Sequence, residues 1–290
     1  MYEKILLPVG DMTGPAEVLH HAGEIAHYFD SEIRLLHVAD TRQYSVTMAE
    51  TGLVDGLERR GEEIVADAGK TLDTLGVEYT TDVVQGSPAA TIVEYAETYD
   101  HDLVIMPTHG RQGLSRHLLG SVTEKVVRLS RTPVLTARMR EDEQFVFPYE
   151  RILLPTDGSE AAQRATEHVL ELAAATDATV HALSVVETGT LGPELLAEFP
   201  VGEFERAARE AVAAVADEAE SRGIPVETHV ETGSADEQIR TAIDEHGCQA
   251  VVMGTTGRRG VDRILLGSVA EKTVRSAPVP VVTVRAEQDR

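Results

Sequence analysis

Short apolar runs alternate along this chain with longer stretches in which apolar residues recur every three or four positions. An apolar run bounded by turn residues predicts a buried strand, and a longer periodic stretch predicts an amphipathic helix. In the first half the pattern predicts strands at residues 4–8, 32–38, 77–84, 102–106 and 133–137, and helices at residues 14–29, 52–75, 88–99 and 121–129. In the second half it predicts strands near residues 151–155, 179–185, 225–230, 249–253 and 279–284, with helices between them.

This alternation predicts parallel sheets, because parallel strands are joined by crossover helices that cover both faces of the sheet. Right-handed crossovers and one reversal of the winding direction then give a flavodoxin-like or Rossmann-like arrangement. The expected fold class is therefore α/β, with two doubly wound, five-stranded parallel sheets in tandem.

The two halves are an internal duplication. Residues 107–125, PTHGRQGLSRHLLGSVTEK, match residues 254–272, GTTGRRGVDRILLGSVAEK, and the same offset of 147 positions relates the other predicted elements. The predicted domains are residues 1–138 and 149–290, and residues 139–148 form the predicted linker. Within the linker, Phe145 and Phe147 are expected to pin the chain onto a domain surface.

Composition and charge argue against some classes of function. The 290 residues carry a formal net charge of −23, which argues against binding to nucleic acid or anionic membranes because both need clustered positive charge. No apolar run reaches the roughly 18 residues of a membrane span, and the first residues show no signal-peptide pattern, so a cytoplasmic location is expected. The basic residues are mostly arginine, and this acidic balance suits a halophilic, salt-rich cytoplasm in which screening weakens self-repulsion.

The most distinctive stretch follows the apolar run at residues 250–253. It contains Gly254, Gly257 and Gly267 before a predicted helix begins at Ser268. Glycine lets the backbone approach a phosphate closely, and the first N–H groups of a helix carry a partial positive charge. The stretch therefore predicts an anion-binding cradle. Asp157 follows the neighbouring first strand of this half, where it could accept a hydrogen bond from a ribose hydroxyl or a base amine.

The same residues also have purely structural interpretations. Ser268 and Glu271, like Ser121 and Glu124 in the first half, match the capping box, in which the two side chains satisfy the first helix N–H groups without a ligand. Asp157 precedes a helix and could itself be the N-cap of that helix.

Other reactive side chains show no constellation that assigns them a chemical role. The single cysteine, Cys248, is expected to be a small buried side chain, and His20, His21 and His27 are expected to face solvent on the first helix. The sequence has no Gly-x4-Gly-Lys-Ser/Thr loop, no Gly-x-Ser-x-Gly elbow and no cysteine pair for zinc.

Three segments together resemble the universal stress protein family: the Gly-x2-Gly-x9-Gly-Ser pattern from Gly254, the Pro-Thr-Asp-Gly-Ser segment from Pro155, and the Ser-Val-Val-Glu segment from Ser184. The resemblance extends over both halves, so the chain looks like a tandem member of that family. In the family this glycine pattern marks members that bind ATP. The resemblance implies that ATP, with or without Mg²⁺, is held by these residues: Pro155, Thr156, Asp157, Val185, Met253, Gly254, Gly257, Arg258, Gly267, Ser268 and Val269.

The first half departs from this pattern at two positions. Pro107 stands where the second half has Gly254, and Gly10 stands where it has Asp157, with Asp11 one place later. Proline removes a backbone donor, and the shifted aspartate alters the reach toward a ribose. These changes put nucleotide binding by the first half in doubt, although it keeps the following residues of the pattern: Val38, Gly110, Gly120, Ser121 and Val122.

The sequence favours a nucleotide-binding stress-response regulatory protein in which ATP occupancy sets conformation or partner choice. Two alternatives stay open: a slow ATP-hydrolysing or ATP-using enzyme, and an interaction scaffold that needs no nucleotide. Binding is favoured over turnover because no motif assigns a metal ligand or a water-orienting residue for phosphoryl transfer. The apolar last strands of the two halves predict an intrachain pseudo-dimer and leave open a homodimer of two chains.

Overall fold

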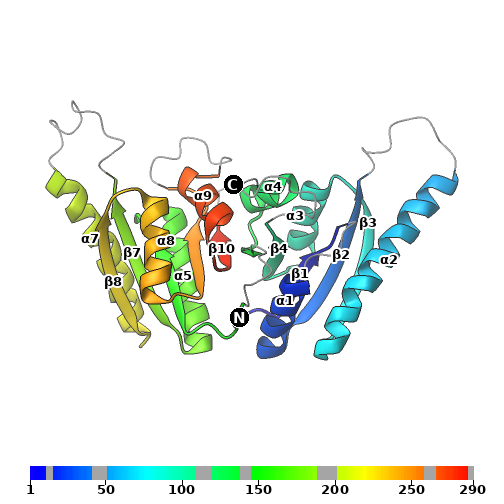
Figure 1. The fold of residues 1–290 in the computed structure, drawn as a ribbon, viewed down its shortest axis with the longest axis horizontal. Helices are drawn as coiled ribbons and strands as arrows, with labels where there is room; N and C mark the ends of the chain where they lie inside the picture. The colour runs from blue at the N-terminus through cyan, green and yellow to red at the C-terminus, as the bar shows by residue number, and fades with distance from the viewer. Residues whose placement is uncertain are drawn as a thin grey trace. The chain divides into compact units, whose positions relative to one another are not determined.

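The structure, a computed structural model, describes residues 1–10, 16–40, 51–108, 119–137, 145–187, 201–257 and 266–286, without the side chains of residues 51–57 and 201. The chain divides into two compact units, Met1–Phe147 and Pro148–Arg290. Figure 1 labels most helices and strands of both units. None of the described helices is long and apolar enough to cross a membrane.

Both units contain five strands and four helices among the described residues. The first unit runs in the order β1 (Lys4–Pro8), α1 (Ala16–Phe29), β2 (Glu32–Asp40), α2 (Thr51–Leu75), β3 (Tyr79–Gly86), α3 (Pro88–Thr98), β4 (Leu103–Pro107), α4 (Ser121–Leu129) and β5 (Val134–Ala137). The second unit runs in the order β6 (Arg151–Pro155), α5 (Glu160–Thr176), β7 (Thr179–Val186), α7 (Val201–Ser221), β8 (Val226–Thr232), α8 (Ala235–His246), β9 (Ala250–Gly254), α9 (Ser268–Ser276) and β10 (Val281–Val284).

The strand order is the same in the two units, and every pairing within them is parallel. The first unit has the order β3-β2-β1-β4-β5 and the second has β8-β7-β6-β9-β10. The winding therefore reverses between β1 and β4 in the first unit, and between β6 and β9 in the second. The predicted fold class, two doubly wound five-stranded parallel sheets in tandem, is confirmed.

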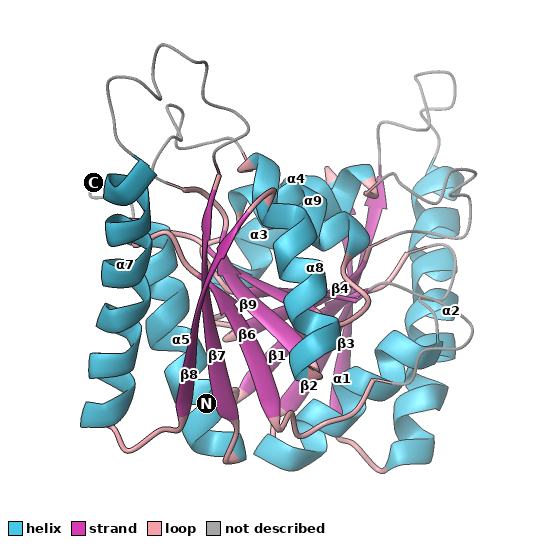
Figure 2. Cartoon of the chain, turned by 60° about the vertical axis from the view of Figure 1, so that its left-hand side comes forward, coloured by secondary structure: helices cyan, strands magenta, loops and turns pink. Residues whose placement is uncertain are grey.

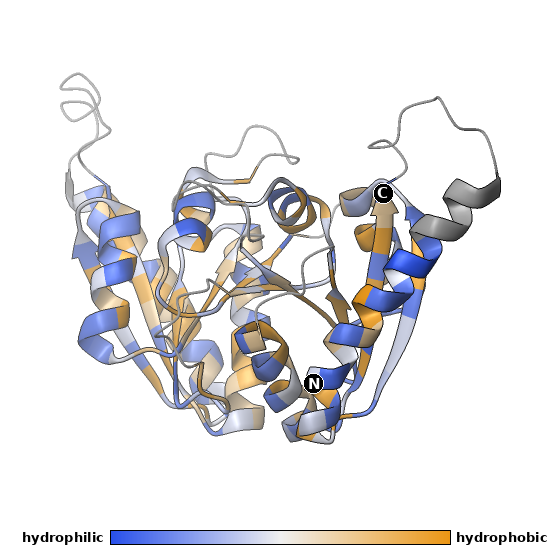
Figure 3. Cartoon of the chain, turned by 45° about the vertical axis from the view of Figure 1, so that its right-hand side comes forward, coloured by the Kyte–Doolittle hydropathy of each residue, from blue (hydrophilic) through white to orange (hydrophobic). Residues whose placement is uncertain are grey.

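The strands form the core of each unit because helices pack against them from both sides. Leu103, Val104 and Ile105 of β4 are fully buried, as are Val251 and Val252 of β9. In the second unit α5 contacts β6, β9 and β10, whereas α8 contacts β6 and β7. Figure 2 shows α8 in front of these strands and α5 behind them. Figure 3 shows the expected consequence, with mostly hydrophobic strands and helices that carry hydrophobic and hydrophilic stripes.

Aromatic side chains attach the end of the first unit to helix α1. The ring centroid of Phe147 lies 5.3 Å from that of Tyr28 and 5.7 Å from that of Phe29, and Phe145 lies 5.2 Å from His21. The prediction that Phe145 and Phe147 pin this segment onto a domain surface is confirmed. The prediction that His21 faces solvent is wrong, because this aromatic cover leaves His21 only 1% exposed. Burial lowers the pKa of His21 below its ordinary value.

A histidine of α5 gives the second unit a measurable dependence on pH. Burial lowers the pKa of His168 from 6.5 to about 4, so the unfolded chain takes up a proton first as the pH falls. The free energy of unfolding should fall by about 1 to 2 kcal/mol between pH 7.5 and 5, because partial exposure of this side chain screens the full effect.

Denaturant unfolding at both pH values checks this expectation. His168→Gln should reduce the loss of stability between the two pH values, whereas His20→Gln, a change at an exposed histidine of α1, should leave it unchanged. An equal pH dependence in the wild type and in His168→Gln would contradict the assignment.

Candidate functional site

The candidate site lies where the winding of the second unit reverses, at the carboxyl ends of β6 and β9. These strands pair in parallel through Ile152 with Ala250 and Leu153 with Val251, so the loops that follow them leave the same edge of the sheet. The two loops approach each other closely. A Cβ atom added to Gly257 would lie 2.7 Å from the Asp157 Oδ2 atom.

The loop after β6 is fixed by hydrogen bonds that its backbone N–H groups donate. The Thr156 N–H donates to the carbonyl of Leu183 in β7 at 2.8 Å, and Gly158 N–H donates to the Thr156 Oγ1 atom at 3.2 Å. Gly158 has φ +72°, a left-handed conformation that glycine adopts without strain. The Ser159 N–H donates to Asp157 Oδ1 at 3.0 Å. The loop backbone therefore orients the Asp157 carboxylate toward the loop after β9.

Asp157 is not the N-cap of helix α5. The N-cap is Ser159, whose hydroxyl oxygen accepts a hydrogen bond from the Ala162 N–H at 3.3 Å. The same Ser159 hydroxyl donates to the carbonyl of Thr256 at 3.4 Å and so links the two loops. The capping interpretation of Asp157 is therefore wrong. Ser159 is the N-cap of α5, a role that was not predicted from the sequence.

Helix α9 begins without a capping side chain. Its N-cap is Gly267, which has none, and Ser268 is the first helical residue. The Gly267 N–H donates to the carbonyl of Thr255 at 2.8 Å, which holds the start of the helix beside the end of β9. The capping-box interpretation, in which Ser268 caps the helix, is therefore wrong. The N–H groups of the first turn are the groups that such a helix start presents to an anion.

Gly254 allows helix α5 to pack directly on the end of β9. A Cβ atom at this position would lie 2.7 Å from the carbonyl carbon and 2.9 Å from the Cβ atom of Ala161. Backbone atoms cannot yield in the way that the end of a flexible side chain can. Pro107 occupies the equivalent position in the first unit, and proline has no backbone N–H to donate.

The first unit keeps the same helix start but differs at the position of Asp157. Gly120 is the N-cap of α4, has no capping side chain and donates its N–H to the carbonyl of Thr108 at 2.8 Å. Ser121, like Ser268, is the first helical residue, so the capping-box interpretation is wrong here too. Gly10 takes the place of Asp157, and a Cβ atom added to it would meet no atom within 4 Å.

The remaining predicted site residues lie at the same edge of the two sheets or outside the described residues. Val185 and Val38 are partly exposed residues near the ends of β7 and β2. Met253 is buried in β9, next to Gly254. Val269 and Val122 are the second residues of α9 and α4, and Pro155 ends β6. Arg258, Gly110 and Asp11 lie outside the described residues.

A second polar cluster, which was not predicted from the sequence, lies in the second unit toward the amino ends of β7 and β8. His181 of β7, His229 of β8 and His246 at the end of α8 place one ring nitrogen each within 4.8 Å of the others. A comparison of the two halves could have indicated this cluster. The positions of His181 and His229 in the second half hold Arg34 and Asp82 in the first half.

The strand order and the position of the winding reversal define each unit as a flavodoxin-like α/β domain. Comparison with known proteins agrees with this class. The sequence model of the universal stress protein family matches residues 1–138 and again residues 148–285. The chain belongs to the universal stress protein family, as a tandem member.

Some relatives match one half of the chain, and others match most or nearly all of it. Universal stress protein MJ0531 of Methanocaldococcus jannaschii is 34% identical over 146 residues, which cover 49% of this chain and 86% of that protein. A universal stress protein of Mycolicibacterium smegmatis is 26% identical over 296 residues, which cover 97% of this chain and 96% of that protein.

Solved structures also match either nearly the whole chain or about half of it. The crystal structure of a universal stress protein from Archaeoglobus fulgidus superposes with a TM-score of 0.74 at 22% identity, covering 99% of this chain and 97% of that one. This likeness supports the fold alone. A universal stress protein solved in complex with cAMP covers 47% of this chain and 97% of its own, at 20% identity and a TM-score of 0.35.

The cap geometry predicts that Ser159, rather than Asp157, stabilises the start of helix α5. Ser159→Ala should lower the free energy of unfolding by about 1 kcal/mol, because it removes the N-cap of α5. Ser87→Ala is a matched control, because Ser87 is the N-cap of α3 but makes no side-chain cap hydrogen bond. Denaturant unfolding measures both changes. A loss from Ser87→Ala as large as that from Ser159→Ala would contradict the assignment of the cap.

Proposed function

We propose that this protein is a regulatory protein that binds an adenine nucleotide, preferably ATP, at the switch point between β6 and β9. The observation that carries the proposal is the uncapped start of α9 beside the loop that holds Asp157. A nucleotide has a negative phosphate end and a ribose with hydroxyl donors, and this site offers N–H groups for the first and a carboxylate for the second.

The surrounding residues support the same assignment. Gly257 and Gly267 carry no side chain at the two places where the loop backbone would approach phosphates. The sequence from Gly257 to Arg263 contains three arginines within an otherwise acidic chain, although their side chains lie outside the described residues. A stress-response role, in which nucleotide occupancy sets conformation or partner choice, follows from family membership as part of the same proposal.

Turnover of ATP is the alternative that a direct measurement can separate from binding. No described residue beside the two loops is assigned as a metal ligand or a water-orienting group, so we expect binding without appreciable hydrolysis. Phosphate release in the presence of ATP and Mg²⁺ tests this expectation. Release that requires Asp157 would favour the enzymatic alternative, and failure to bind any adenine nucleotide would favour the interaction scaffold.

Several sequence predictions go with this proposal. They are the pairing of the two units through their last strands, a homodimer of chains, the cytoplasmic and salt-rich setting, and Mg²⁺ as a companion of ATP. Each stays a prediction.

Matched glycine substitutions test the position of the phosphate site. In Gly267→Val and Gly120→Val the added Cβ atom would meet a carbonyl oxygen at similar distances, 3.2 Å from Thr255 and 3.3 Å from Thr108. The two variants should therefore lose similar stability. Only Gly267→Val should abolish ATP binding measured by calorimetry, because it crowds the start of α9. Unchanged ATP affinity in a folded Gly267→Val protein would sink the assignment.

Substitution of Asp157 tests the inequality of the two units. Asp157→Ala should weaken ATP binding tenfold to over a hundredfold, because one lost charge-assisted hydrogen bond is worth roughly 1.5 to 3 kcal/mol. Gly10→Asp in the first unit has room for its side chain and should leave the affinity of the main site unchanged. If Asp157→Ala kept full binding while Gly120→Val removed it, the dominant site would belong to the first unit.

A further inference from the structure

In the second unit, the amino-terminal halves of β7 and β8 and the end of α8 hold a cluster of three histidines and one glutamate, whereas the proposed nucleotide site lies at the carboxyl ends of β6 and β9. In the parallel register of β7 and β8, His181 pairs with Glu227 and Leu183 pairs with His229. His246 joins them as the last residue of α8, which packs on β6 and β7. The cluster therefore rests on regular elements rather than on loops.

The distances between these side chains suit a shared metal ion. The Nδ1 atom of His181 lies 3.2 Å from the Nε2 atom of His229 and 3.7 Å from the Oε2 atom of Glu227. Two imidazole nitrogens bound to one tetrahedral zinc ion at about 2.0–2.1 Å are about 3.3 Å apart. One nitrogen of each of the three histidines lies within 4.8 Å of the others, so small ring rotations would bring all three to one ion.

We propose that His181, His229 and His246 bind a divalent transition-metal cation, best matched by Zn²⁺, and that Glu227 supplies the fourth ligand. Three imidazoles and one carboxylate are donors that zinc accepts in four-coordinate sites. Such an ion would tie β7, β8 and α8 together at their common end. This proposal does not depend on the proposed nucleotide site.

The first unit shows how the same place is filled without a metal. At the position of His181 it has Arg34, and at the position of His229 it has Asp82. The Arg34 guanidinium donates to the Asp82 carboxylate at 2.8 Å, and the Tyr95 hydroxyl donates to the same carboxylate oxygen. The first unit thus places a permanent cation between these strands, whereas the second unit has metal-ligand side chains there instead.

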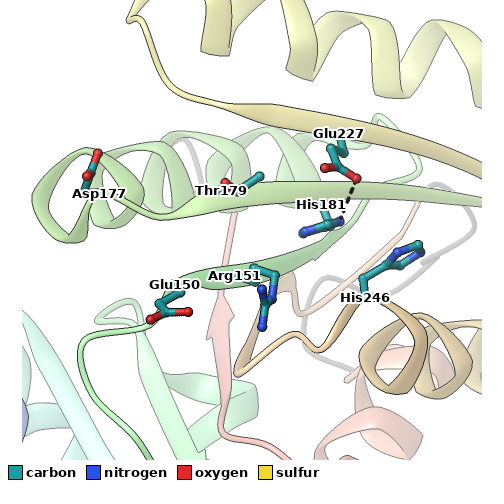
Figure 4. Close-up of a pocket in the computed structure, with 7 residues that line it drawn as sticks. All are labelled: Glu150, Arg151, Asp177, Thr179, His181, Glu227 and His246. Carbon is teal, nitrogen blue, oxygen red and sulfur yellow. Dashed lines mark ion pairs between the residues drawn. The ribbon is translucent and has the colours of Figure 1, made fainter.

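The surroundings leave room for an ion and hold the third histidine in place. A pocket of about 580 Å³ is lined by His181, His246, Glu227 and Arg151 among others (Figure 4). The Arg151 Nε–H donates to the carbonyl of Gly247 at 3.1 Å, which fixes the end of α8 next to His246. A cation at this end of α8 is also favoured by the partial negative charge of the last helical carbonyls.

Stacking of the three imidazole rings is the competing explanation for the cluster. The His229 and His246 rings are 4.1 Å apart between centroids and inclined by 27°, and His181 stacks on both. A stacked cluster would bind no metal, so metal binding itself separates the two explanations.

The test is a titration of the full chain, without a histidine tag and stripped of metal by a chelator, with Zn²⁺ against a chromophoric zinc indicator. We expect one tightly bound Zn²⁺ per chain, and Co²⁺ in its place should give the visible absorption of a four-coordinate ion. His181→Gln and His229→Gln should lower the Zn²⁺ affinity by at least about 10- to 100-fold, the loss that removal of an outer-shell partner already causes. His20→Gln, at an exposed histidine of the first unit, should leave the affinity unchanged.

A double variant separates the loss of Zn²⁺ binding from the loss of folding. His181→Arg/His229→Asp transplants the ion pair of the first unit into the second, so it should fold, as judged by circular dichroism, and bind no Zn²⁺. In the unaltered protein, one equivalent of Zn²⁺ should shift the ring signals of three of the eleven histidines in an NMR spectrum. Absence of bound Zn²⁺, Zn²⁺ binding that survives both single variants, or histidine signals that stay unshifted would overturn the proposal.

Discussion

The parallel pairing of β6 with β9 determines where the second unit can place a ligand. Because these strands lie side by side while their helices pack on opposite faces, none of the described helices covers the edge where both strands end. The loops that follow must therefore meet each other, and the contact between Gly257 and Asp157 is the result. The approach of Ala161 to Gly254 depends on the same pairing, since it brings α5 against the end of β9.

Much of this architecture could be predicted from sequence because it depends on local patterns. The apolar runs of the central strands are buried on both faces, so each of them stands out without any knowledge of its neighbours. The repeat then confirmed each element twice. The helix starts were harder, because Ser268 and Ser121 match a capping box in spacing alone. Whether a serine is the N-cap or the first helical residue depends on backbone angles, and here Gly267 and Gly120 take the N-cap position.

Burial of polar residues depends on contacts between segments that lie far apart in the chain, and sequence patterns do not report such contacts. His21 lies on a helix whose neighbouring histidines suggested an exposed face, yet Phe145, more than a hundred positions away, packs on it. The histidine cluster is a similar case. His181 and His229 become neighbours only through the register of β7 with β8, and a shift of one residue would move either side chain to the other face of the sheet.

The two units show how a duplicated fold can divide its tasks while the scaffold stays the same. At the carboxyl ends of the strands the first unit has Pro107 and Gly10, and the second has the close packing at Gly254 and the carboxylate of Asp157. At the amino ends the first unit is closed by the ion pair of Arg34 with Asp82, whereas the second has His181 and His246 beside a pocket. The second unit therefore differs from the first at both ends of its strands, and an ion at the amino ends would stiffen β7 and β8 without occupying the edge where a nucleotide would bind.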